Sequence, residues 1–129
     1  MTTAWHALAQ LVSWPDLTET GSSCGTGRAL RSAGAELAHF HSDRRVDLHL
    51  TAGAIRRYER DLRRSTAIRL VPGSHWVTVR LECEADVSLL MTLMSAALRA
   101  HQEGPDTPDA PAARCNDRLE TALAQREYL

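Results

Sequence analysis

Residues 36–51 constrain the fold of this chain more than any other stretch. Apolar and polar residues alternate there on both sides of a polar break at Ser42–Arg44. This pattern is typical of two antiparallel strands joined by a short loop, each with one buried face. A slip of one residue would move aliphatic side chains to the polar face, so the sequence specifies the pairing strongly.

The pairing of the two strands follows from matching their apolar faces. Directly opposed side chains of an antiparallel pair lie on the same side of the sheet. Phe40 is therefore expected to pair with Val46, and His39 with Asp47. We expect the other side of this hairpin to point away from the core. By strict alternation it carries Leu37, His39, His41, Asp47 and His49.

The remaining sequence extends the hairpin into a single α+β domain over residues 1–103. Helical spacing of apolar residues predicts helices at 3–13, 51–64 and 86–101. Runs rich in β-branched or alternating residues predict strands at 28–31, 66–71 and 76–83. We expect an antiparallel sheet of about five strands with helices mainly on one face. Residues 104–129 are expected to form a Pro/Asp linker and a C-terminal helical tail.

The same patterns predict the environment of individual side chains. Residues 18–27, rich in Gly, Ser and Thr, are expected to form a loop. The first helix is expected to bury Trp5, Leu8, Ala9 and Val12. The strand at 76–83 is expected to point outward with Trp76, Thr78, Arg80 and Glu82, and inward with Val77, Val79, Leu81 and Cys83.

Composition excludes several classes of protein. The 129 residues have a formal net charge of −1, so no overall charge attracts nucleic acid or anionic membrane. We see no signal peptide or spanning segment and expect a cytoplasmic protein. All the basic residues are Arg, which suggests a GC-rich bacterial genome. The cysteines at 24, 83 and 115 form no CxxC pair, and we interpret them as reduced thiols.

Three stretches resemble the luciferase-domain family. They are AHFHSDRRVDLHLT at 38–51, STAIRLVPGSHWVTVRL at 65–81, and the Glu-x-Asp element at 84–86 that opens the last helix. The resemblance extends over roughly residues 24–101, and the order of elements is distantly similar to MmcQ/YjbR-like double-wing domains. The resemblance implies an oxygenase that oxidises a pyrone-type phenolic substrate with molecular oxygen and uses neither flavin nor metal.

The polar face of the hairpin supports three interpretations. Two imidazoles on alternate strand residues, with Asp47, could bind one metal ion. Alternatively, His39 oriented by Asp47 could act as a general base, with Arg80 and Arg69 stabilising a substrate anion. The face could also be a polar outer surface, with His39 and Asp47 making an ordinary cross-strand contact.

We interpret the face as a site for a small aromatic or polyketide-like molecule, which the protein could oxidise without a cofactor or a metal. The candidate catalytic residues are His39, His41, Asp47, His49 and Arg80. The candidate ligand-binding residues are Arg69, His75 and Trp76.

The alternative function is a non-catalytic binding module. Such a module would contact a protein partner, or nucleic acid through the Arg-rich helix at 56–64, although interleaved acidic residues make nucleic acid the less favoured partner. Besides the small-molecule ligand, we allow for a homodimer and expect no membrane association.

Overall fold

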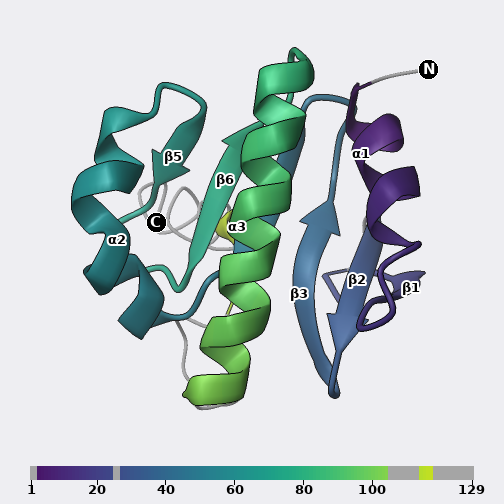
Figure 1. Cartoon of the computed structure of the whole chain (residues 1–129), viewed down its shortest axis with the longest axis horizontal. Coiled ribbons are helices and arrows are strands. Elements are labelled where there is room, and N and C mark those ends of the chain that lie inside the picture. Colours follow the sequence, from purple (N-terminus) through teal and green to yellow (C-terminus); the bar gives the residue numbers. More distant parts are fainter. Residues whose placement is uncertain (1–2, 25–26, 105–113, 118–129) are drawn as a thin grey trace, which may run out of the picture.

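A six-stranded antiparallel sheet with three helices organises the chain in the computed structural model, which describes residues 3–24, 27–104 and 114–117 (Figure 1). Along the chain the elements are α1 (Thr3–Leu11), β1 (Thr18–Gly21), β2 (Arg28–Ser32), β3 (Ala35–Phe40), β4 (Arg45–His49), α2 (Ala52–Arg64), β5 (Ile68–Leu70), β6 (Trp76–Arg80) and α3 (Glu84–Glu103). The strand order is β1-β2-β3-β4-β6-β5. The predicted α+β class is confirmed.

Strand β1 is the strand that the sequence prediction missed. Its residues, Thr18–Gly21, pair with β2 at the edge of the sheet, and all of them are exposed or only half-buried. A strand with no buried face has no reason to alternate apolar and polar residues. The expected loop at 18–27 is therefore wrong over its first four residues.

The register of the central hairpin is confirmed. Phe40 pairs with Val46, and His39 pairs with Asp47. Val46 and Leu48 are completely buried on the face that the helices cover. Thr51 caps α2, since its side chain accepts a hydrogen bond from the backbone N–H of Ala54.

A bulge in β3 changes the faces on which two residues lie. Leu30 of β2 pairs with Ala38, whereas Arg31 pairs with Glu36, so Leu37 is an extra residue in its strand. Leu37 is completely buried in the core, and its expected place on the polar face is wrong. The bulge also brings Glu36 to the side of the sheet that carries the histidines.

All three helices cover the same face of the sheet (Figure 1), as the sequence predicted. The buried stripe of α1 differs from the expectation, because Trp5 and Val12 are exposed. Ala9 is exposed as well, whereas Leu8 is buried as predicted and is joined by Ala4, Ala7 and Leu11. Small alanine side chains let the helix approach its neighbour α3 closely.

The opposite face of the sheet is covered at its centre, which corrects the expectation of an outward face. His39, Asp47 and Trp76 are each only 3% exposed, and Thr78 is also buried. Trp76 packs there with Cys24 and Cys115 in a second, smaller cluster of buried residues. Arg80 is only half-buried.

Residues 114–117 supply part of this cover, and their polar groups hold them on the sheet. The side-chain amide of Asn116 donates to the carbonyl of Trp76 at 3.2 Å and to the hydroxyl of Thr78 at 3.0 Å. The hydroxyl of Ser74 donates to the amide oxygen of Asn116. The predicted linker and helical tail otherwise lie outside the described residues.

Cys83 is exposed, so its prediction as a core thiol is wrong. Strand β6 ends at Arg80 and α3 begins at Glu84, and Cys83 occupies the N-cap position of that helix. The alternation that would have buried Cys83 therefore stops before reaching it. In the part of the chain that is described, no helix is long and apolar enough to cross a membrane.

Candidate metal centre

Four side chains that can ligate a metal converge on the covered face of the sheet. Cys24, His39, His41 and Cys115 each place one ligand atom so that all four atoms lie within 4.8 Å of one another. The two cysteines and His39 are buried, with exposures of 8%, 2% and 3%, and His41 is half-buried. We refer to these four residues as the Cys2His2 cluster.

Three separate segments supply the cluster. His39 is in β3, and His41 follows that strand directly, so both imidazoles leave the same side of the sheet. Their rings meet edge to face with centroids 5.4 Å apart. Cys24 follows β1, and Cys115 belongs to the segment that covers the sheet after α3.

The distances around His41 suit a tetrahedral metal. Measured from Nε2 of His41, the Sγ atom of Cys115 lies at 3.5 Å and the Sγ atom of Cys24 lies at 3.9 Å. Zinc–sulfur and zinc–nitrogen bonds of ordinary length, at tetrahedral angles, place sulfur and nitrogen about 3.6 Å apart. The spacing of these donors therefore matches that of ligands around one zinc ion.

His39 has one satisfied nitrogen and one unsatisfied nitrogen. Its Nε2 lies 3.0 Å from Oε1 of Glu36, a carboxylate oxygen that can only accept a hydrogen bond. Its Nδ1 is buried and has no hydrogen-bond partner among the described residues. With the proton held on Nε2, the lone pair on Nδ1 is free to bind a metal, the usual arrangement of a carboxylate behind a metal-binding histidine.

Asp47 holds the covering segment and His41 together. Its Oδ1 accepts the hydroxyl proton of Thr78 at 2.7 Å, and its Oδ2 accepts the backbone N–H of Asp117 at 2.9 Å. Oδ2 also lies 3.5 Å from Nε2 of His41. Burial alone would raise the pKa of Asp47, but the hydrogen bonds from His41, Thr78 and Asp117 lower it below its ordinary value.

The surroundings of the two imidazoles differ. Burial disfavours the charged ring of His41, yet its hydrogen bonds to Asp47 and Cys115 and the negative charge of the Cys24 and Cys115 thiolates raise its pKa to about 10. Burial dominates at His39 and lowers its pKa, partly offset by Glu36. The pKa of Glu36 is lowered, because hydrogen bonds with Ser23 and the charge of His39 outweigh its burial. The cluster is thus rich in groups that favour a cation.

His49 and Trp76 lie beside the cluster and extend it as a row of rings. The His49 ring stacks on Trp76 with centroids 4.8 Å apart, and the His39 ring lies 4.7 Å from Trp76 on a tilt. The ring of His101 meets His49 edge to face, and its Nε2 lies 3.0 Å from the His49 carbonyl oxygen. His49 therefore shares the covered face but is not one of the four clustered donors.

The three other sequence-derived candidates do not join the cluster. Arg80 lies opposite Arg45 at the end of β6, with its Nε 3.4 Å from a carboxylate oxygen of Glu82. Arg69 is exposed on β5. The carbonyl of His75 accepts the backbone N–H of Thr51.

Sequence analysis missed three members of this site, namely Cys24, Cys115 and Glu36. The two cysteines are far apart in the chain and form no local metal-binding motif, so only the folded chain brings them together. Glu36 reaches His39 because of the bulge at Leu37, which strict alternation cannot reveal. The only feature of the sequence that could have indicated a thiol-containing metal site is the presence of unpaired cysteines together with histidines.

The fold and the site together define the class of protein. It is an α+β domain whose sheet carries a buried cluster of two thiols and two imidazoles, covered in part by residues 114–117. A family model, described as the luciferase domain, matches residues 34–97, and the chain belongs to the luciferase-domain family. The matched segment runs from the start of β3 into α3 and contains His39, His41 and Asp47, whereas Cys24 and Cys115 lie outside it. Neither the curated proteins nor the solved structures contain a match to this chain.

Proposed function

We propose that the protein binds one zinc ion at the Cys2His2 cluster, and that the ion stabilises the domain by fastening residues 114–117 to the sheet. The observation that carries this proposal is the convergence of four ligand atoms within 4.8 Å, from segments that are distant in sequence. Two thiolates and two imidazoles are a common ligand set of structural zinc sites.

The donor types select the metal. Thiolates and imidazoles bind zinc well, whereas calcium and magnesium take oxygen ligands. Two thiolates also neutralise the charge of a divalent ion, so the centre can be buried without a net charge. Four protein ligands leave no open position for a substrate, which makes the role structural rather than catalytic.

The carboxylates beside the two imidazoles support the same function. Glu36 accepts a hydrogen bond from His39, and Asp47 lies beside His41. Such carboxylates orient imidazole ligands and raise their basicity. Glu36 is in the position expected behind a metal-binding imidazole, whereas Asp47 lies at Nε2 of His41, the nitrogen that also faces Cys115.

This proposal differs from the metal-free chemistry that the sequence favoured. A base at His39 and Asp47 would need room for a substrate, but both residues are buried beneath the Cys24 and Cys115 segments. Small-molecule binding, which the resemblance to the luciferase domain implies, remains a second proposed function. Its site would be the other face of the sheet, where α2 and α3 border a cleft of about 230 Å³.

The test is elemental analysis of the untagged full-length protein, purified under reducing conditions without chelator. We expect about one zinc per chain, the stoichiometry of a mononuclear site. The variants Cys115→Ser and His39→Ala should lose the metal, while Cys83→Ser should keep it. Cys83 is the matched control, because it is a cysteine of the same chain that lies exposed outside the cluster.

Cobalt substitution gives a second readout of the ligand set. A tetrahedral cobalt centre with thiolate ligands has intense visible bands and a sulfur-to-metal charge-transfer band. The charge-transfer band should weaken in Cys24→Ser and remain in Cys83→Ser. Wild-type protein that binds neither metal after reconstitution would overturn the proposal. Cys24, His41 and Asp47 would then be examined as a thiol–imidazole–carboxylate relay by measuring the rate of alkylation of Cys24.

A further inference from the structure

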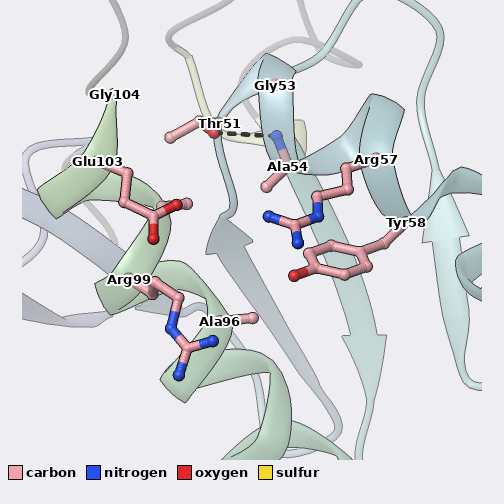
Figure 2. A pocket seen from close by; sticks show the side chains of 10 residues that line it. Thr51, Gly53, Ala54, Arg57, Tyr58, Ala96, Arg99, Glu103 and Gly104 are labelled. Carbon is pink, nitrogen blue, oxygen red and sulfur yellow. Dashed lines mark hydrogen bonds between the residues drawn. The ribbon is translucent and has the colours of Figure 1, made fainter.

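A cleft between two helices lies on the face of the sheet opposite the metal centre (Figure 2). Its volume is about 230 Å³, and its walls come from the first turns of α2 and the last turns of α3. The cleft is open because the helices present small residues to each other, namely Gly53 and Ala54 on α2 and Ala96 and Ala100 on α3. A Cβ atom added to Gly53 would meet no atom within 4 Å.

Two arginines from different helices line this cleft. Arg57 comes from α2 and Arg99 from α3, and neither makes an ion pair within the part of the chain that is described. Arg28 and Arg63, by contrast, are paired with glutamates at 2.7 and 2.8 Å. Among the described residues, neither of these two guanidinium groups has a carboxylate within ion-pair distance, so both leave positive charge at the cavity.

The walls also offer a flat surface beside this charge. The guanidinium of Arg57 lies over the ring of Tyr58, 5.4 Å from its centroid, and both side chains face the cleft (Figure 2). Alanine methyl groups form the opposite wall. The apolar ring of a ligand would fit between these two surfaces. An acidic group on that ring would reach the two guanidinium groups, because guanidinium binds carboxylate or phosphate through paired hydrogen bonds.

We propose that the cleft binds a small organic anion, consisting of one flat apolar ring that carries a carboxylate or phosphate group. The volume lies below the roughly 300–1,000 Å³ of pockets for drug-sized ligands, so a single ring fits better than a fused system. Glu103, one turn after Arg99, lines the same cleft and disfavours ligands with a second anionic group on that side. The site needs no residue of the Cys2His2 cluster, so it goes beyond the zinc proposal.

Benzoate, phenyl phosphate and inorganic phosphate are the probes that test this site. We would titrate each into isotope-labelled, zinc-supplemented protein at constant ionic strength and follow the amide resonances. The two ring-bearing anions should shift the amides of Gly53, Ala54, Ala100 and Gly104 in a saturable way. Inorganic phosphate should bind at least about tenfold more weakly, since it leaves the apolar walls unfilled.

Matched variants distinguish specific binding in the cleft from nonspecific electrostatic attraction of anions to arginine. Arg57→Ala and Arg99→Ala should each weaken benzoate binding about tenfold, the effect of losing one charged hydrogen bond. Arg60→Ala, an exposed arginine of the same helix outside the cleft, should leave it unchanged. Ala96→Leu keeps both arginines and fills the cavity, so it should also abolish binding.

Two results would overturn the proposal. One is the absence of a saturable shift for either ring-bearing anion. The other is equal weakening by Arg60→Ala, which would show nonspecific charge. Zinc content would be measured for every variant, so that a failure of the metal proposal is seen separately from a failure of this one.

Discussion

Glu36 accepts hydrogen bonds from two parts of the metal centre through one oxygen. Its Oε1 lies 3.0 Å from Nε2 of His39, and it accepts the backbone N–H of Ser23 at 2.9 Å. Ser23 directly precedes Cys24, so one carboxylate positions an imidazole ligand and the loop that carries a thiol ligand. The bulge at Leu37 is what places Glu36 on this side of the sheet.

We expect Glu36→Gln to weaken zinc binding by about 10- to 100-fold while leaving one zinc per chain at saturation. Glutamine keeps the size of the side chain, but its neutral amide is a weaker acceptor for the His39 proton. Affinity would be measured by competition with a chelating indicator. Glu19→Gln is the control, because Glu19 pairs with Arg28 on the surface of the same sheet. Equal affinities for the two variants would refute a positioning role for Glu36.

Removal of the metal should destabilise the wild-type protein. A ligand that binds only the folded state adds about 4 kcal/mol when present at a thousand times its dissociation constant. For a domain of this size, chelation should then lower the melting temperature by roughly 15 °C. Cys83→Ser should respond to chelator in the same way. Cys115→Ser should start from the lower melting temperature and show no further change, and a chelator response in that variant would contradict the assignment.

Sequence alone predicts the centre of this fold well, for a physical reason. Apolar and polar residues alternate along the hairpin, so only one register buries Val46 and Leu48. That register pairs His39 with Asp47. The helices on the apolar face follow from the same argument, since a sheet with one apolar face must be covered there.

The metal centre was not predictable in this way, because its parts come from segments without a periodic pattern. Cys24 lies after an exposed edge strand, and Cys115 lies in a segment that is held mainly by polar contacts of Asn116 and Asp117. The segments of Cys24 and Cys115 cover the histidines because of tertiary contacts, and no local hydrophobic pattern in the sequence predicts this. Strict alternation therefore predicts a polar face that points outward and could carry a site, whereas the centre of this face is buried.

Asn116 should prove to be the main polar anchor of the covering segment. Its side chain is 1% exposed and bonds with Ser74, Trp76 and Thr78. Asn116→Ala removes all three of these buried hydrogen bonds, although Thr78 still bonds to Asp47 and Ser74 still accepts from the Trp76 N–H, and we expect a loss of about 2 kcal/mol in the free energy of unfolding. Urea denaturation of the zinc-loaded protein would measure it. Asp117→Ala keeps the backbone N–H that bonds to Asp47, so it should cost much less. A similar loss in both variants would argue against a specific anchor.

Gly27 connects the loop of Cys24 to the backbone of β3, and it should not tolerate a side chain. Its φ is +75°, and an added Cβ would lie 2.1 Å from the carbonyl oxygen of Phe40. Gly34 also has a positive φ, of +84°, but a Cβ there would meet no atom within 4 Å. Gly34→Ala should therefore cost only the backbone strain, about 1 kcal/mol.

We expect Gly27→Ala to cost several kcal/mol, because the strand and the loop must separate to relieve the overlap. Since Cys24 lies on the same loop, the variant should also bind zinc more weakly, whereas Gly34→Ala should bind it normally. Thermal melts with and without chelator would measure both effects on the two variants. If Gly27→Ala lost stability but kept full zinc affinity, Cys24 would have to be positioned by contacts other than this close approach, such as the bond between Glu36 and Ser23.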